Sequence, residues 1–217
     1  MKRKLVFATN NLNKLKEVRN VEGLNCRSYA SSPGFSNPGI RNMPDQRSAF
    51  EILSLKDIGF SGEIPEDFDT LKENALQKAR VIHSFSGLDC FADDTGLEID
   101  ALDGKPGVLS ARYAGPACNS EDNIDKVLEE LKGKTIRTAR FRTVIALIMD
   151  GEEHFFESTV EGEILAERQG EDGFGYDPIF LPSCYTQSFA EMDLSFKNKI
   201  SHRAKAVRKL IKYLVNK

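Results

Sequence analysis

The sequence predicts an α/β fold, in which buried strands alternate with amphipathic helices. Two apolar runs, residues 5–8 and 140–149, have the length and composition of buried strands. Apolar residues recur at helical spacing after Thr70 and after Ser201, and both residue types commonly cap helices. The chain of 217 residues has no internal repeat and is long enough for one sizeable core, so we expect a single domain over residues 1–217.

The composition limits the possible partners. Hydrophobic residues make up 40% of the chain and charged residues 29%, which is ordinary for a soluble globular protein. The formal net charge of −3 gives no overall basic field, so binding to a nucleic-acid polymer is not expected. The last segment is locally basic and suits a small polyanion; its cations are Lys197, Lys199, Arg203, Lys205, Arg208, Lys209 and Lys212.

Nothing in the sequence indicates export or a membrane. The apolar run after the basic residues 2–4 is too short for a signal peptide, and no run reaches the length of a membrane span. Cys26, Cys90, Cys118 and Cys184 lie far apart without C-x-x-C spacing. We therefore expect reduced thiols in a cytoplasmic protein, without a zinc site or a disulfide framework.

The N-terminal part predicts a strand, a polar loop and the start of a helix. The strand covers residues 5–8, the loop residues 9–14, and Leu15 and Val18 then have helical spacing. From residue 21 to residue 49, serine, proline, glycine and asparagine break every periodic pattern, which predicts a long loop or mobile insertion. An apolar strand resumes at residues 50–55.

A helix and an acidic turn follow. Thr70 and Glu73 form a capping box, and the helix that they start is expected to end near Gly87. Its inward face would consist of Leu71, Ala75, Ala79 and Ile82. A strand at residues 88–92 then leads into a turn at residues 93–96, and residues 97–101 alternate as a half-buried strand does.

The C-terminal half predicts two helices and further strands. Ser120 is expected to cap a helix that is closed by Gly133. Residues 140–149 predict a central strand, and residues 154–160 and 162–166 predict a hairpin partner and its return. A last helix starts near Ser201, with an apolar stripe of Ala204, Val207, Leu210, Ile211 and Leu214.

Four polar segments are candidates for function. The first is the loop of Thr9, Asn10, Asn11, Leu12, Asn13 and Lys14. Backbone N–H groups at a helix N-terminus favour anions, and Lys14 adds a positive charge, so this loop suits phosphates. An asparagine-rich turn is the alternative interpretation.

The second segment is the acidic turn Asp93-Asp94-Thr95-Gly96. Two adjacent carboxylates repel each other unless a cation or a shared proton lies with them. Mg²⁺ is the expected cation, because it takes oxygen ligands and is commonly bound by one or two carboxylates together with phosphates. An ordinary surface β-turn would also contain these residue types.

The third and fourth segments suit a flat base. Two glycines flank Phe174 in the run Gly173-Phe174-Gly175-Tyr176-Asp177-Pro178, so the backbone could approach a ring that stacks on Phe174 while Asp177 accepts hydrogen bonds. Cations are slightly unfavourable at a helix start, which suggests that His202 and Arg203, with Lys197 before them, hold an anion or a carbonyl-rich ring. The alternatives are an aromatic-anchored turn and a solvated basic helix face. Taken together, the four segments point to a nucleoside triphosphate.

Six blocks in this chain resemble, in the same order, those of the inosine triphosphate pyrophosphatases, which act on nonstandard purine nucleotides. The blocks are Thr9-Asn10-Asn11-x-x-Lys14, Glu73-Asn74-Ala75-x-x-Lys78-Ala79, Ala92-Asp93-Asp94-Thr95-Gly96-Leu97, Pro106-Gly107 with Ser110-Ala111-Arg112-Tyr113, Gly173-Phe174-Gly175-Tyr176-Asp177-Pro178, and Ile200-Ser201-His202-Arg203. The resemblance covers nearly the whole chain apart from the Ser/Pro/Asn-rich insertion at residues 21–49, which departs from the family pattern.

The resemblance implies a two-lobed α/β fold with a long curved mixed β-sheet flanked by helices, a homodimer, and an active site in the cleft between the lobes. It implies Mg²⁺-dependent hydrolysis of ITP, dITP and XTP to the monophosphate and pyrophosphate. Asp94 would be the catalytic proton acceptor and a metal ligand, supported at the metal by Glu66 and Asp93. Substrate contacts would come from Thr9, Asn10, Asn11, Leu12, Asn13, Lys14, Thr95, Phe174, Gly175, Tyr176, Asp177, Lys197, His202 and Arg203.

Two other functions compete with this one. A Maf-like nucleotide pyrophosphatase would share the architecture and act on other bases, but the blocks at residues 173–178 and 201–203 argue against it. A non-catalytic nucleotide-binding module would keep Phe174 and His202 without needing Asp94 and a metal.

Overall fold

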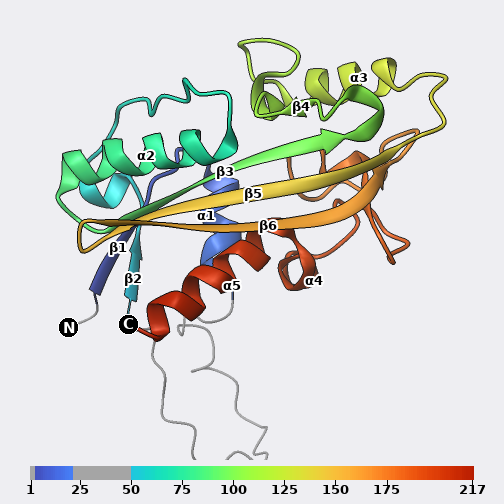
Figure 1. The fold of residues 1–217 in the computed structure, drawn as a ribbon. Coiled ribbons are helices and arrows are strands. Elements are labelled where there is room, and N and C mark those ends of the chain that lie inside the picture. Colours follow the sequence, from blue (N-terminus) through green and yellow to red (C-terminus); the bar gives the residue numbers. More distant parts are fainter. Residues whose placement is uncertain (1–2, 22–49) are drawn as a thin grey trace, which may run out of the picture.

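The computed structural model describes residues 3–21 and 50–217 (Figure 1). The predicted insertion at residues 21–49 lies outside the described residues, apart from Val21. None of the helices in the described ranges has the length and apolarity that a membrane span requires.

The centre of the fold is a curved mixed sheet (Figure 1). The described residues contribute seven strands: β1 (Arg3–Phe7), β2 (Phe50–Leu53), β3 (Cys90–Ile99), β4 (Pro106–Gly107), β5 (Thr138–Met149), β6 (Glu152–Ile164) and β7 (Phe180–Pro182). Their order is β2-β1-β3-β5-β6-β7, and β4 pairs with β3. The pairs of β1 with β2 and β3 are parallel and the remaining pairs are antiparallel. The predicted α/β class with a long mixed sheet is confirmed.

Helices cover both faces of this sheet. In the described ranges they are α1 (Leu12–Arg19), α2 (Leu71–Ser86), α3 (Ser120–Glu130), α4 (Leu194–Ile200) and α5 (His202–Val215), with short 3-10 turns at Lys56–Ile58, Asp100–Leu102, Ser110–Arg112 and Asp177–Ile179. In Figure 1, α2 and the red helix α5 lie on opposite sides of the long strands, and α3 lies at the far end of those strands.

The helix boundaries follow the capping chemistry of the sequence. Thr70 accepts a hydrogen bond from the backbone N–H of Glu73, as the capping box predicts, and Gly87 ends the helix in a left-handed conformation. The cap predicted at Ser201 is also confirmed. The cap predicted at Ser120 is wrong by one residue, because the side chain of Asn119 accepts the first N–H groups of α3.

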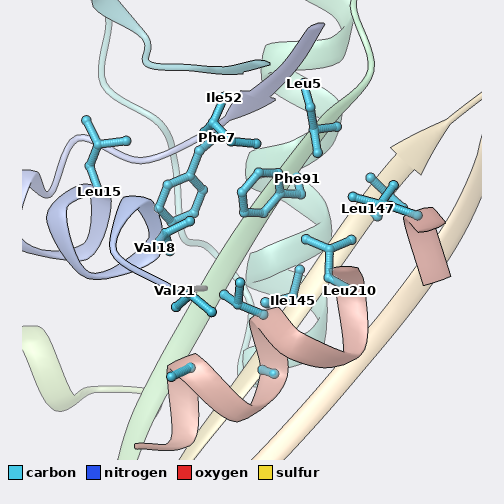
Figure 2. Close-up of a cluster of buried hydrophobic side chains, with 14 of the residues drawn as sticks. Leu5, Phe7, Leu15, Val18, Val21, Ile52, Phe91, Ile145, Leu147 and Leu210 are labelled. Carbon is cyan, nitrogen blue, oxygen red and sulfur yellow. The ribbon is translucent and has the colours of Figure 1, made fainter. Parts of the chain in front are cut away.

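The apolar core consists of three clusters. One lies between the sheet, α1 and α5, and includes Phe7, Val18 and Leu210 (Figure 2). A second lies on the opposite face beneath α2, and the third lies around α3 at the other end of the long strands. The two ends of the sheet therefore have cores of their own, in agreement with the predicted two-lobed architecture.

Two expectations about the strands are wrong. Residues 93–96 form no turn, because β3 continues through them and every residue of β3 pairs with β5, Asp93 with Ile145 and Asp94 with Val144. The hairpin partner expected at residues 154–160 is confirmed by its antiparallel pairing with β5, but the return strand expected at residues 162–166 is wrong, because β6 is one strand from Glu152 to Ile164. In each case long-range pairing keeps a segment with turn-like residues inside the sheet.

Candidate active site

A cavity of about 360 Å³ opens where strand β1 stops. β1 pairs with β3 only as far as Phe91, and β4 pairs with β3 only from Leu97 onward. The intervening edge of β3 has no neighbouring strand on that side among the described residues. This gap places the middle of β3 beside the loop that leads into α1.

Most of the predicted site residues line this cavity. They are Thr9, Asn10, Asn11, Lys14, Glu66, Asp94, Thr95, Phe174, Gly175, Tyr176, Asp177, Lys197, His202 and Arg203. Leu12, Asn13 and Asp93 are not among the lining residues; the side chain of Leu12 is 78% exposed. The structure thus brings together segments from residues 9–14, 66, 94–95, 174–177 and 197–203.

The loop before α1 is organised by its own side chains. Asn11 Oδ1 accepts hydrogen bonds from the backbone N–H groups of Asn13 (2.9 Å) and Lys14 (3.1 Å), and Thr9 Oγ1 accepts one from Asn11 (3.1 Å). The sequence analysis predicted that backbone N–H groups of this loop bind a phosphate, but these three N–H groups already have side-chain partners within the loop. The ammonium group of Lys14 is then the main positive charge that this loop offers to the cavity.

An acidic centre lies on the α2 side of β3. Oδ1 of Asp94 accepts a hydrogen bond from Nζ of Lys78 at 2.9 Å, and Lys78 also bonds to Glu66. Burial raises the pKa of Asp94, and the charge of Lys78 only partly opposes this effect. Burial alone would lower the pKa of Lys78, but the two carboxylates outweigh it, so that Lys78 stays protonated.

The residues of this centre fit a hard cation in part. Oδ2 of Asp94 is buried without a hydrogen-bond partner, and an unpaired buried carboxylate oxygen is a ligand that Mg²⁺ prefers. Glu66 is a further carboxylate beside Asp94, since the two share Lys78. Within the described residues, however, no three acidic, histidine or cysteine side chains converge as a ready metal site.

Asp93 lies on the other face of β3. Its Oδ2 accepts hydrogen bonds from Nε of Arg203 (3.0 Å) and Oγ1 of Thr95 (3.1 Å), and Nζ of Lys14 lies 3.2 Å away. Burial would raise the pKa of Asp93, but Lys14 and Arg203 outweigh burial and hold the pKa well below its ordinary value. The carboxylates of Asp93 and Asp94 are therefore bound to different groups.

The opposite end of the cavity is aromatic and richly hydrogen-bonded. The half-buried ring of Phe174 has Lys197 Nζ 5.1 Å and Arg203 Cζ 5.6 Å from its centroid. Oδ2 of Asp177 accepts hydrogen bonds from Lys197 Nζ (2.6 Å) and from the N–H of Phe174 (2.8 Å). Gly173 is required by this packing, because at its φ of 81° an added Cβ would lie 2.3 Å from Oδ2 of Asp177.

His202 presents a neutral ring to this end of the cavity. It stacks on Phe141 with 4.6 Å between ring centroids, and its Nδ1 is buried without a hydrogen-bond partner in the described structure. Burial, and then the charges of Arg203 and Lys197, hold the pKa of His202 well below 6.5. A neutral imidazole with an unpaired nitrogen can donate to or accept from a bound ring.

Two charged residues that hold predicted site residues in place, Lys78 and Glu17, were not predicted as site residues. Lys78 was visible only as part of a family block, and Glu17 was not recognised at all. Glu17 is 4% exposed and bonds to Lys197 at 2.7 Å across 180 residues of chain, and also to Arg203. One local signal existed: Glu17 lies one helical turn after Lys14 and directly before the buried Val18.

Comparison with known proteins agrees with this geometry. The sequence profile of the Ham1 family matches residues 5–213. The chain belongs to the Ham1 family. Similar proteins include the dITP/XTP pyrophosphatases of Christiangramia forsetii, 49% identical over 97% of this chain and 98% of that protein, and of Porphyromonas gingivalis, 49% identical over 98% of this chain and 97% of that protein. The Ham1 protein structure from Coxiella burnetii matches with a TM-score of 0.80 and 33% identity, covering 99% of this chain and all of that one.

Proposed function

We propose that this Ham1-family protein hydrolyses nonstandard purine nucleoside triphosphates, ITP, dITP and XTP, to the monophosphate and pyrophosphate. One observation carries the proposal: a single cavity of about 360 Å³ joins an acidic, lysine-lined end to an aromatic end with buried hydrogen-bonding groups. This volume suits a small-molecule ligand. The names of the relatives from Christiangramia forsetii and Porphyromonas gingivalis support the same activity.

In this mechanism Asp94 is the general base. It takes a proton from a water molecule whose oxygen attacks the α-phosphorus, and the bond from that phosphorus to the bridging oxygen breaks, so that pyrophosphate leaves. The position of Asp94 in the cavity wall, beside Lys14 and Lys78, supports this role. Lys14 and Lys78 line the same end of the cavity and would hold phosphate oxygens in line for the attack.

A metal is also part of the proposal. Mg²⁺ bound by Asp94 and Glu66 would neutralise charge on the phosphate oxygens and acidify the attacking water. The unpaired Oδ2 of Asp94 supports this ligand choice. Asp93 was predicted as a third ligand; its Oδ1 is also buried without a partner, but its Oδ2 is bound to Lys14 and Arg203 on the other face of β3.

Base selection would take place around Phe174, Asp177 and His202. Hypoxanthine and xanthine present a 6-keto oxygen and an N1–H group, whereas adenine presents an amino group at that position. Adenine would leave donors of His202 or Arg203 and the acceptor Asp177 without partners. Sites built on such hydrogen bonds discriminate by up to about 10⁴–10⁵.

The decisive experiment measures pyrophosphate release from ITP, dITP, XTP, GTP and ATP, with and without Mg²⁺. We expect release from the first three nucleotides, dependent on Mg²⁺, and little release from ATP. Orthophosphate as the primary product, or preference for ATP, would refute the proposal. Preference for another base would favour a Maf-like specificity, and binding without turnover would favour a non-catalytic module.

We further propose that the enzyme is a cytoplasmic homodimer. The resemblance to inosine triphosphate pyrophosphatases supports the dimer, and the separated cysteines support a reducing compartment. Light scattering coupled to size-exclusion chromatography gives the mass in solution, to be compared with 24.3 kDa for one chain.

A further inference from the structure

We infer that Asp93 is a positioning residue, which fixes Lys14 and Arg203 relative to each other and so connects the phosphate end of the cavity to its base end. The inference rests on the proposed function for the meaning of the two ends. It assigns Asp93 to substrate binding, in contrast to the metal site that the sequence predicted for it.

A single carboxylate oxygen of Asp93 is surrounded by donors. Three donors converge on Oδ2 of Asp93: Nε of Arg203 at 3.0 Å, Oγ1 of Thr95 at 3.1 Å and Nζ of Lys14 at 3.2 Å. Arg203 also donates to Oγ1 of Thr95 at 3.1 Å, so the arrangement is closed. The side chain of Asp93 is 1% exposed, which keeps these interactions free of competition from solvent.

Asp93 lies behind the residues that form the cavity wall. Lys14, Thr95 and Arg203 all line the cavity, whereas Asp93 does not. Asp93 can therefore reach a ligand only through the residues that it holds. Asp94, by contrast, lines the cavity, and its carboxylate accepts a hydrogen bond from Lys78 and not from Lys14 or Arg203.

The two cations that Asp93 holds are carried by different helices. Lys14 comes from the first turn of α1 and Arg203 from the first turn of α5, two helices that are far apart in the sequence. Arg203 continues the network to Glu17, which bonds to Lys197 at 2.7 Å, and Lys197 bonds to Asp177 at 2.6 Å. Asp93 is thus the link between Lys14 and a chain of alternating charges that reaches the base end.

Loss of this carboxylate should affect binding more than turnover. In Asp93→Asn the side chain keeps its shape, but Lys14 and Arg203 lose their shared counter-charge and repel each other. Both would then be misplaced towards the phosphates and the base of a bound nucleotide. The hydrogen bonds of Asp94, Lys78 and Glu66 do not involve Asp93, so the proposed base and its two nearest charged neighbours keep their contacts, and of the groups proposed for the chemical step only Lys14 is affected.

The test compares Asp93→Asn with the matched control Glu98→Gln. Glu98 lies on the same strand and pairs with Arg142, but it does not line the cavity. Binding of dITP is measured by calorimetry in EDTA, and KM and kcat for dITP are measured with Mg²⁺. We expect Asp93→Asn to raise Kd and KM at least about tenfold and to lower kcat less than about fivefold, which follows from the loss of one charge-assisted hydrogen bond. Glu98→Gln should match the wild type.

A conservative variant and a cycle of variants sharpen the test. Asp93→Glu keeps the charge and should recover part of the lost affinity. In a cycle of Lys14→Gln and Arg203→Lys, which leaves Asp93 intact, the effects on Kd should be non-additive if Asp93 couples the two cations. Additive effects would overturn the inference even if Asp93→Asn fails to fold.

The opposite pattern in Asp93→Asn would also overturn it. Unchanged dITP affinity in EDTA with a large loss of kcat that added Mg²⁺ restores would return Asp93 to the metal site. Failure of the proposed function has another signature, since wild-type protein would then bind dITP without releasing pyrophosphate.

Discussion

Lys78 holds Asp94 by one oxygen atom only. Its Nζ lies 2.9 Å from Oδ1, while Oδ2 of the same buried carboxylate has no hydrogen-bond partner. Lys78 is shared with Glu66, whose other carboxylate oxygen lies 3.5 Å from Nη1 of Arg112, so Lys78 is the common partner of the two carboxylates at the acidic end of the cavity. The unpaired oxygen leaves Asp94 free to act on a further group, and the first two predictions follow from this arrangement.

Asp94→Asn should abolish catalysis and retain binding. The amide cannot accept the proton of the attacking water, so pyrophosphate release from dITP should fall by about 10²–10⁴-fold or more. The affinity for dITP in EDTA should change little, because Asn keeps the size of the side chain. Near-normal turnover would exclude Asp94 as the base. Asp103→Asn, at an exposed position with a φ of 54° that Asn tolerates, is the control.

Lys78→Met should make stability depend on Mg²⁺. Without the ammonium group, the buried carboxylate of Asp94 loses its hydrogen-bonded counter-charge, and loss of one partner from a buried ion pair typically costs about 3–5 kcal/mol. Mg²⁺ should restore more of the Tm in this variant than it adds to the wild type, because the cation replaces the lost charge. Equal shifts in both proteins would speak against a metal at these carboxylates. Arg80→Met, which breaks an exposed pair on the same helix, should cost less than about 1 kcal/mol.

Phe174→Ala should weaken nucleotide binding without changing the reaction. A base that stacks on an aromatic ring gains about 1–3 kcal/mol, so the Kd for dITP should rise by about 5- to 150-fold. Inorganic triphosphate has no base, and its affinity should stay the same. Phe196→Ala removes an exposed ring of α4 that does not line the cavity, and should leave both affinities unchanged.

His202 should make the protein less stable in mild acid. Its pKa is well below 6.5 in the folded state, so below about pH 6.5 the unfolded chain binds a proton there that the folded chain does not. The free energy of unfolding should therefore fall between pH 6.5 and pH 5, by at most about 1.4 kcal/mol per pH unit from this group. Urea titrations at several pH values should show a shallower dependence in His202→Asn. Parallel curves for the two proteins would contradict a neutral buried ring.

Local chemistry made much of the fold predictable. The capping box at Thr70 and the cap at Ser201 start their helices as predicted, because a cap depends on residues only three positions apart. Most of the predicted site residues line one cavity for a similar reason. They lie in the polar segments between strands and helices, which the fold brings together.

Two glycines show why the strands were harder to predict. Gly96 was predicted in a turn and Gly162 at the start of a separate return strand, yet each lies inside one continuous strand. A Cβ on Gly96 would lie 2.6 Å from the carbonyl oxygen of Gly107, and one on Gly162 would lie 2.4 Å from that of Leu181. These glycines allow a neighbouring strand to approach closely, a requirement set by residues distant in the sequence. The bond between Glu17 and Lys197 was hidden for the same reason.

The long strand β5 joins the two lobes into one cooperative unit. Ile145, Ala146 and Phe141 each belong to a different apolar cluster, so a single strand runs through all three. Neither lobe can lose its core without exposing apolar side chains of that strand, and heat or denaturant should melt the molecule in one transition. Because β5 continues from one lobe into the other, the two lobes share strand backbone as well as packed side chains.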